Sequence, residues 1–200
     1  MFLRCALRAG GLLGAGTLLA ACGKTKSAEF HAVDITGIDY ARDFHLTDFN
    51  GQQRGLADFR GDVVAVFFGY TQCPDVCPTT LADLTQTKRL LGSDGERLQV
   101  VFISLDPERD TPDVLRAYMQ SFDPDFLGLS AGSTAALDQL VMQFKIFYQK
   151  VEGEQPGQYS VDHTAATYVY DPQGKVRLFV RYGTSPREMA DDIRQLLNGA

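Results

Sequence analysis

The sequence contains little cysteine and little histidine, with four cysteines and three histidines in 200 residues. It also lacks a basic excess, because 25 acidic residues outnumber 19 basic ones. Without a basic stripe, we expect no nucleic-acid partner. Internal repeats and low-complexity segments are absent as well. The chain is therefore expected to form one ordinary globular domain.

A long hydrophobic run is absent except at the N-terminus, where Arg4 and Arg8 precede an apolar stretch at residues 9–21. That stretch is too short for a comfortable bilayer span, which needs about 20 apolar residues. Its basic start and small final residues are typical of a secretory signal. The run Leu19-Ala-Ala-Cys22 resembles a bacterial lipoprotein cleavage box. We therefore expect residues 1–22 to be a signal peptide ending at a lipidated Cys22, with an uncleaved membrane anchor as the alternative.

Both interpretations of residues 1–22, a lipoprotein signal peptide and an uncleaved anchor, place the protein at a bacterial membrane. Its domain would face the periplasm or the cell exterior, where disulfides can persist. Residues 23–39 are polar and without clear periodicity, which predicts a flexible tether in which His31 is solvated. The 178 residues after Cys22 are enough for one domain with a real core. They hold 17 basic and 25 acidic residues, and the resulting charge of −8 weakly favours a positively charged protein partner.

Hydrophobic periodicity predicts an α/β domain over residues 40–198. Apolar runs at 63–68 and 98–104 are typical of strands buried on both faces, and Asn50-Gly51 after an alternating segment predicts an N-terminal β-hairpin. The other predicted elements are helices at 78–91, 111–122 and 185–197, a helix from residue 133 or 134 whose apolar face reaches Phe147, and an antiparallel strand pair at 167–170 and 176–180. This order matches a thioredoxin-like fold with an inserted helical segment.

Cys73 and Cys77 are the two cysteines outside the leader, with three residues between them and each followed by proline. Such a close pair is a disulfide, a redox switch or part of a metal site. Because proline disfavours helical geometry in the residue before it, we expect the helix to begin at Pro78 with Cys77 near the N-cap. Free amides and the helix dipole at that end would lower the pKa of both thiols.

The spacing of the two cysteines makes a structural disulfide and a thioredoxin-type redox motif less favoured than a metal site. A structural disulfide would close a very small loop, where a crosslink gains little entropy. Thioredoxin-like redox enzymes use two intervening residues, whereas this chain has three. The extra residue can leave the sulfurs further apart and permits a metal between them.

His163 is the best candidate for a third ligand, because His31 lies in the tether and His45 falls in the first hairpin, opposite Phe44, as a structural residue. The polar segment 159–164 is expected to be a loop leading into the strand at 167–170. In a thioredoxin-like sheet this loop lies against the cysteine loop, and thioredoxins place a cis-proline there. Here a histidine takes the facing position.

Two thiolates and one imidazole suit copper, because thiolates favour Cu(I) and imidazole tolerates Cu(II). Zinc would prefer a fourth ligand for a closed structural site. Asp162 could orient the imidazole, although turn formation explains this aspartate equally well. Asp75 could contact a metal or a partner, or it could simply be a solvated loop carboxylate. The four methionines do not cluster in the sequence, which argues against a thioether copper site.

At this point the sequence resembles the SCO/SenC family over residues 40–197. The matching segments are Phe67-Phe-Gly-Tyr-Thr-Gln-Cys-Pro-Asp-Val-Cys-Pro-Thr-Thr80, Ile103-Ser-Leu-Asp-Pro-Glu-Arg-Asp-Thr-Pro112, and Asp162-His163 followed by Tyr168-Val-Tyr-Asp-Pro172. The resemblance implies a thioredoxin-like fold and copper held by Cys73, Cys77 and His163. Gln72 departs from the family, since many members have histidine or phenylalanine there, and an effect on partner contact at most is expected.

The resemblance further implies a membrane-tethered copper metallochaperone that assists assembly of the dinuclear copper centre of cytochrome c oxidase subunit II, with an upstream copper donor as a further partner. The alternative is a thiol–disulfide oxidoreductase that reduces the cysteines of that centre, for which Cys73 and Cys77 would be the redox pair. A peroxide-reducing thiol enzyme ranks last, because no arginine lies near the cysteines in the sequence.

Overall fold

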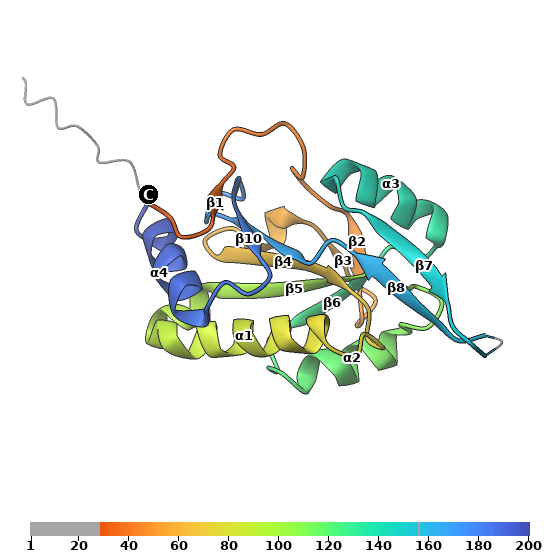
Figure 1. The fold of residues 1–200 in the computed structure, drawn as a ribbon. Helices are drawn as coiled ribbons and strands as arrows, with labels where there is room; N and C mark the ends of the chain where they lie inside the picture. The colour runs from red at the N-terminus through yellow and green to blue at the C-terminus, as the bar shows by residue number, and fades with distance from the viewer. Residues whose placement is uncertain (1–28, 156) are drawn as a thin grey trace, which may run out of the picture.

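The computed structural model describes residues 29–155 and 157–200 (Figure 1). The predicted signal peptide and Cys22 lie outside these residues. Within the described ranges, no helix is long and apolar enough to cross a membrane.

The structure is an α/β domain with one large sheet, a separate two-stranded ribbon and four α-helices in its described part (Figure 1). The strands are β1 (Val33–Asp34), β2 (Leu46–Asp48), β3 (Gln53–Arg54), β4 (Val63–Gly69), β5 (Leu98–Ser104), β6 (Leu127–Ser130), β7 (Tyr148–Glu152), β8 (Tyr159–His163), β9 (Ala166–Tyr170) and β10 (Val176–Arg181). The helices are α1 (Val76–Leu91), α2 (Pro112–Gln120), α3 (Thr134–Phe144) and α4 (Pro186–Leu197), with short 3-10 turns at Leu56–Phe59 and Gly92–Arg97.

The large sheet has the strand order β1-β10-β9-β4-β5-β6-β2-β3. Strands β4, β5 and β6 run parallel, whereas β9 pairs antiparallel with β4 and β10 pairs antiparallel with β9. Every residue of β4 is buried, as its continuous apolar sequence predicts for a central strand covered on both faces. This arrangement confirms the thioredoxin-like fold, and β2 with β3 confirms the N-terminal hairpin.

Helices cover both faces of the sheet (Figure 1). On one face Phe67 and Phe102 pack together, and Tyr118 of α2 packs against Phe102. Helices α1 and α4 pack against each other on this face. On the opposite face Phe68 packs edge-on against Phe144 of α3. The two phenylalanines at 67 and 68 thus divide the core, because neighbouring side chains of a strand point to opposite faces.

The ordered domain begins earlier than the boundary predicted at residue 40. Strand β1 pairs antiparallel with β10, and the backbone N–H groups of His31 and Ala32 donate to the buried carboxylate of Asp192 at 2.9 and 2.8 Å. A flexible tether is therefore the wrong description for residues 31–34. The side chain of His31 is exposed, as predicted.

Two further features differ from the expected order of elements. Strand β6 lies between α2 and α3, and it contains Gly128, where a Cβ atom would come within 3.2 Å of Leu115 and Met119 in α2. That glycine permits the close approach of the helix but weakens the strand pattern in the sequence. Phe147 lies beyond the end of α3 and is 59% exposed, so it does not belong to the buried face of that helix.

Candidate metal centre

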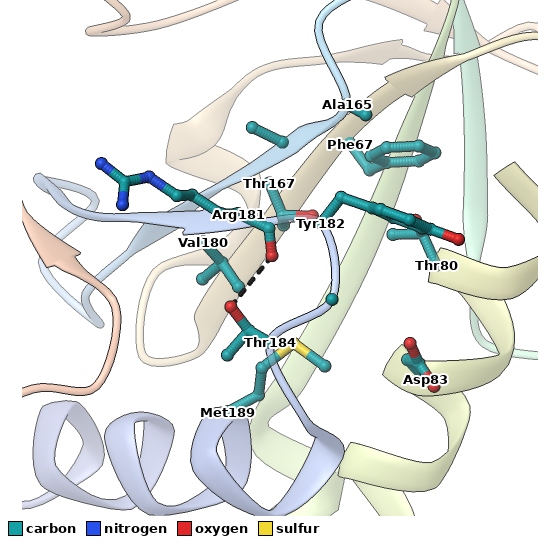
Figure 2. A pocket seen from close by; sticks show the side chains of 12 residues that line it. Phe67, Thr80, Asp83, Ala165, Thr167, Val180, Arg181, Tyr182, Thr184 and Met189 are labelled. Atoms are coloured by element: carbon teal, nitrogen blue, oxygen red, sulfur yellow. Dashed lines mark hydrogen bonds between the residues drawn. The ribbon is translucent and has the colours of Figure 1, made fainter. Parts of the chain in front are cut away.

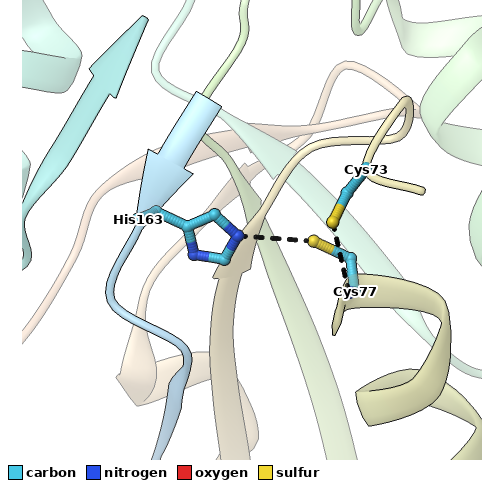
Figure 3. A group of neighbouring side chains, drawn as sticks. All are labelled: Cys73, Cys77 and His163. Atoms are coloured by element: carbon cyan, nitrogen blue, oxygen red, sulfur yellow. Dashed lines mark hydrogen bonds between the residues drawn. The ribbon is translucent and has the colours of Figure 1, made fainter. Parts of the chain in front are cut away.

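Cys73, Cys77 and His163 converge at the end of β4 (Figure 3). One ligand atom from each residue lies within 4.8 Å of the other two. The Sγ of Cys77 is 3.5 Å from Nε2 of His163, and the backbone N–H of Cys77 donates to Sγ of Cys73 at 3.4 Å. The three residues predicted as ligands thus form one cluster, although 86 residues separate the histidine from Cys77.

Helix α1 carries Cys77 in its first turn, because the helix begins at Val76 with Asp75 as N-cap. The predicted start at Pro78 is therefore two residues too late. The first four N–H groups of a helix have no intrahelical partner, so the missing N–H of a proline in the first turn removes no hydrogen bond. The free amides still face the cysteine loop, as predicted.

Gly69, the last residue of β4, makes room for the Cys77 thiol. A Cβ atom at this position would lie 2.8 Å from Sγ of Cys77 and 2.8 Å from the ring of Phe102, distances that real Cβ atoms essentially never show. Cys77 is fully buried, whereas Cys73 is partly exposed. The absence of a side chain at residue 69 therefore sets how deeply Cys77 can sit against the sheet.

The two thiols differ in acidity, in contrast to the prediction that both pKa values are lowered. A hydrogen bond from the Cys77 thiol, together with His163 and the backbone N–H groups of Cys77 and Asp75, lowers the pKa of Cys73 to about 3 against the effect of burial. The hydrogen bond with Cys73 and then burial raise the pKa of Cys77. Without a metal, the negative charge of the pair resides on the accessible sulfur.

His163 is the last residue of β8 and not part of a loop, because β7 and β8 form a ribbon that the sequence pattern did not predict. Its Nδ1 lies 3.1 Å from the carbonyl oxygen of Thr164, an acceptor, so Nδ1 donates and carries the proton. Nε2 is consequently the ring nitrogen that faces Cys77, at 3.5 Å from its Sγ. The rings of Phe67 and Tyr70 pack edge-on against the imidazole and hold its plane.

The two aspartates considered as accessory groups lie outside the ligand cluster. Asp162 is exposed and pairs through its backbone with Gln149, while the carbonyl of Thr164 takes the role of orienting the imidazole. Asp75 is exposed, and its carboxylate accepts a long hydrogen bond of 3.5 Å from the Thr79 hydroxyl. His45 is also solvent-exposed rather than structural.

Two buried aspartates after β5, Asp106 and Asp110, bind residues around the candidate metal centre, and the sequence pattern did not predict this. The carboxylate of Asp110 accepts hydrogen bonds from the hydroxyls of Ser104 and Thr71, both at 2.6 Å, and from the Thr71 backbone N–H at 3.3 Å. Asp106 accepts from Nε of Arg109 and, at 2.8 Å, from the hydroxyl of Tyr159. Both aspartates lie in the segment from Ile103 to Pro112, which resembles the SCO/SenC family, and this resemblance is the sequence signal that points to them.

An arginine lies beside the cysteine loop although none is near it in the sequence. Nη1 of Arg109 donates to the Gln72 side chain at 3.1 Å, so Gln72 has an intramolecular role beyond the expected effect on partner contact. The hydrogen bonds of Arg109 go to Asp106, Gln72 and Tyr159, and none goes to either sulfur. Nε and Nη1 of the guanidinium are thus engaged by the protein itself, whereas the buried Nη2 has no hydrogen-bond partner among the described residues.

The metal centre opens into a groove of about 390 Å³ between the cysteine loop and β8. Its lining residues are Tyr70, Cys73, Pro74, Asp75, Val76, Ser160, Val161, Asp162, His163 and Ala165. A neighbouring pocket between α1, β10 and the start of α4 has a space of only about 20 Å³, enough for a single water (Figure 2). The groove is therefore the place where an ion or an acceptor can approach the three ligands.

The donor set fits copper. Two sulfurs and one imidazole nitrogen within 4.8 Å of one another can close around a single ion, and soft thiolates favour Cu(I). Neither Asp75 nor Asp162 belongs to the ligand cluster, so within residues 29–155 and 157–200 the set lacks the fourth ligand that a closed structural zinc site needs.

Comparison with known proteins agrees with this geometry. A sequence model of the SCO1/SenC family matches residues 34–198. An SCO2-like protein of Rickettsia conorii is 36% identical over 76% of this chain and 74% of its own, and the human mitochondrial SCO2 homolog is 37% identical over 76% and 58%. The structure of Bradyrhizobium japonicum ScoI with copper bound is similar, with a TM-score of 0.69 and 38% identity over 77% of this chain and 97% of that one. The chain belongs to the SCO1/SenC family.

Proposed function

We propose that the protein is a copper metallochaperone that assists assembly of the dinuclear copper centre of cytochrome c oxidase subunit II. The convergence of Cys73, Cys77 and His163 carries the proposal, because their ligand atoms all lie within 4.8 Å of one another. Membership of the SCO1/SenC family supports it, since a Sco protein of known structure is described as a member of a family of cytochrome c oxidase assembly proteins. The similar ScoI structure contains copper.

Copper is cargo in this proposal, and the chain's own residues explain how it is held and released. Cys73 lies at the groove as a ready thiolate, whereas Cys77 gives up its proton when the ion binds. His163 presents Nε2 because Thr164 fixes the proton on Nδ1. A ligand of the acceptor can enter through the groove and replace the exposed donors first, so that the ion passes by exchange of ligands.

Anaerobic titration of the reduced soluble domain with Cu(I), in competition with a chelator of known affinity, tests this proposal. We expect one tightly bound copper per chain, and an affinity at least tenfold weaker in the His163→Ala variant. The Cys73→Ser variant should lose stoichiometric binding and keep its melting temperature within a few degrees. The absence of stoichiometric copper in the wild type, or equal affinity in His163→Ala, would show the proposal to be wrong.

A thiol–disulfide oxidoreductase is the second candidate, and the asymmetry of the two cysteines favours it. The Cys73 thiolate would attack a disulfide of the acceptor and form a mixed disulfide, which releases one acceptor thiolate. Cys77 would lose its proton and attack Cys73, which releases the second acceptor thiolate and leaves a Cys73–Cys77 disulfide. The acceptor is reduced by two electrons and the cysteine pair is oxidised.

The direction of attack gives a test that separates this role from copper transfer. With an oxidised subunit II fragment, the Cys77→Ser variant should accumulate a mixed disulfide through Cys73, and Cys73→Ser should not. The double variant Cys77→Ser, His163→Ala should form the same adduct through Cys73. If no adduct appears while copper transfer proceeds, the reductase role is contradicted.

We further propose that residues 1–22 are a lipoprotein signal peptide and that a lipidated Cys22 anchors the protein to a bacterial membrane, with the domain facing the periplasm or the cell exterior. Mass spectrometry of the mature N-terminus tests this. A diacylglyceryl cysteine at residue 22 is expected, and a Cys22→Ala variant should stay unprocessed. An unmodified, retained leader in the wild type would contradict the anchor.

A further inference from the structure

His163 stands on a ribbon that is separate from the large sheet. In the part of the chain that the structure describes, strands β7 and β8 pair only with each other, and a two-stranded ribbon is marginally stable by itself. Its position relative to the cysteine loop must therefore come from contacts outside the ribbon. At the end beside His163 the ribbon is closed by its own flanking residues: the Thr164 backbone N–H donates to the Phe147 carbonyl oxygen, and the Phe147 backbone N–H donates to the Thr164 hydroxyl, both at 3.0 Å.

We propose that Arg109 is a positioning residue for the metal centre, which fixes the ribbon bearing His163 against the loop bearing Cys73. This inference rests on the proposed copper binding, because copper affinity is the property that the positioning affects.

Arg109 contacts both ligand-bearing segments at once. On the ribbon, its Nη1 donates to the carbonyl oxygen of Tyr159 at 3.0 Å, and its guanidinium lies 3.5 Å from the centroid of the Tyr159 ring. On the other side, Nη1 donates to Oε1 of Gln72, the residue before Cys73, at 3.1 Å. The guanidinium also lies 5.8 Å from the ring centroid of Tyr70, which packs against His163. A single planar group thus bridges the two segments.

Asp106 holds this bridge in place. Its fully buried carboxylate pairs with Nε of Arg109 and accepts from the Tyr159 hydroxyl, so the three side chains close a ring. A charge-assisted pair with a guanidinium has a fixed geometry that a lysine ammonium does not reproduce. One neighbouring ion pair, between Lys150 and Glu108 at 2.8 Å, joins the ribbon to the same loop.

Strand β8 connects the residue that Arg109 contacts, Tyr159, with the proposed ligand, His163. Tyr159 and His163 are four residues apart on β8, so their side chains point to the same face of the strand. Val161 between them is buried. Fixing the backbone and ring of Tyr159 therefore limits both the tilt of β8 and the distance from Nε2 of His163 to the sulfurs.

Arg109→Lys is the test variant, because a lysine can keep the ion pair with Asp106 but cannot also reach Gln72 and the Tyr159 carbonyl. Arg116→Lys is the matched control. Arg116 also pairs with an aspartate, Asp113, donates to the backbone carbonyl of Phe49 and stacks on its ring, but it contacts neither ligand-bearing segment. We expect Arg109→Lys to weaken Cu(I) affinity about tenfold and Arg116→Lys to leave it within twofold.

A double-mutant cycle shows whether Arg109 acts through the histidine. In the His163→Ala background, Arg109→Lys should change Cu(I) affinity by less than twofold, because the ligand that it positions is gone. Gln72→Ala keeps the ion pair with Asp106 and removes only the link to the cysteine loop. It should weaken affinity in the same direction but less, and add nothing to Arg109→Lys. An equal loss with and without His163, or wild-type affinity in Arg109→Lys, would overturn the proposal.

Amide hydrogen exchange of the copper-free protein gives a readout that does not depend on the metal. Exchange in β7 and β8 should be at least tenfold faster in Arg109→Lys than in the wild type, and unchanged in Arg116→Lys. Unchanged ribbon exchange in Arg109→Lys would overturn the positioning role. If the wild type bound no copper, the proposed function would fail, and this comparison would still test the contact made by Arg109.

Discussion

Cys77 Sγ and His163 Nε2 lie 3.5 Å apart, although 86 residues separate the two along the chain. Cys77 belongs to the first turn of α1, and His163 ends β8. Strand β4 brings them together, because its C-terminal end leads into the cysteine loop and pairs with the start of β9, the strand that follows His163. The metal centre is therefore a product of tertiary structure.

Gly69→Ala should displace the Cys77 thiol from its buried position and weaken copper binding. The added Cβ would lie 2.8 Å from both Cys77 Sγ and the Phe102 ring, so the thiol has to move out of its buried position. Overpacking of this kind typically costs about 1–3 kcal/mol. We expect a lower melting temperature together with a weaker Cu(I) affinity, measured by calorimetry and chelator competition. Gly61→Ala is a control for the general effect of replacing glycine, since no atom lies within 4 Å of its added Cβ, although its positive φ adds backbone strain. Equal affinity losses in the two variants would contradict the account.

Cys73 should react with iodoacetamide as a thiolate over the whole range from about pH 5 to pH 8. Its pKa of about 3 leaves the sulfur deprotonated there, whereas the pKa of Cys77 is raised and its side chain is buried. Peptide mass spectrometry of the copper-free, reduced protein should locate the first adduct on Cys73, at a rate nearly independent of pH. A rate that rises tenfold per pH unit between pH 6 and pH 8 would show that the low pKa is wrong.

Asp110→Asn should change how stability depends on pH. Burial raises the pKa of Asp110, so the folded state favours its protonated form. The stabilisation from this group is fully present below the pKa of the unfolded chain, about 3.8, and is lost as pH rises through the higher folded pKa. Asparagine stays neutral and can still accept from Thr71 and Ser104. Urea unfolding from pH 3 to pH 7 should show a gain in stability of the variant over the wild type as pH rises. A difference that is constant with pH would contradict this.

Asp192→Ala should release the segment before β1. The buried carboxylate accepts both the His31 and the Ala32 backbone N–H groups, and its loss leaves these donors without a partner. The cost is expected to be about 1–3 kcal/mol. Amide exchange should become faster at residues 31–35 and stay unchanged in β4 and β5. Copper affinity should not change, because β1 is an edge strand of the sheet, whereas the metal centre lies at the end of the central strand β4. A weaker affinity would contradict this separation.

The fold was largely predictable because its central strands and helix starts have strong local signals. The apolar run of β4 and the Thr111-Pro112 and Ser185-Pro186 starts of α2 and α4 are examples, and both caps accept the expected backbone hydrogen bonds. Strand β6 was missed because packing against α2 requires Gly128, which weakens the local pattern. The ribbon was missed because most of its residues are polar and at least partly exposed, and only tertiary contacts stabilise it.

The cluster of three candidate ligands was predictable, whereas the residues that contact it were not. Two cysteines at close spacing and a histidine in a polar segment are visible in the sequence. The different acidities of the cysteines come from burial and from a hydrogen bond between them, which follow from the first turn of α1 and Gly69. Arg109 is 37 residues from Gln72 and 50 from Tyr159, so its bridging role appears only in the folded chain.

X-ray absorption spectroscopy of the Cu(I)-loaded protein tests the central claim most directly, because it counts the atoms bound to the metal by element. The account predicts two sulfur ligands and one nitrogen ligand in the wild type, with the nitrogen lost in His163→Ala and one sulfur lost in Cys73→Ser. A wild-type spectrum with two sulfurs and no nitrogen, or one unchanged by His163→Ala, would contradict the assignment of Cys73, Cys77 and His163 as the copper ligands.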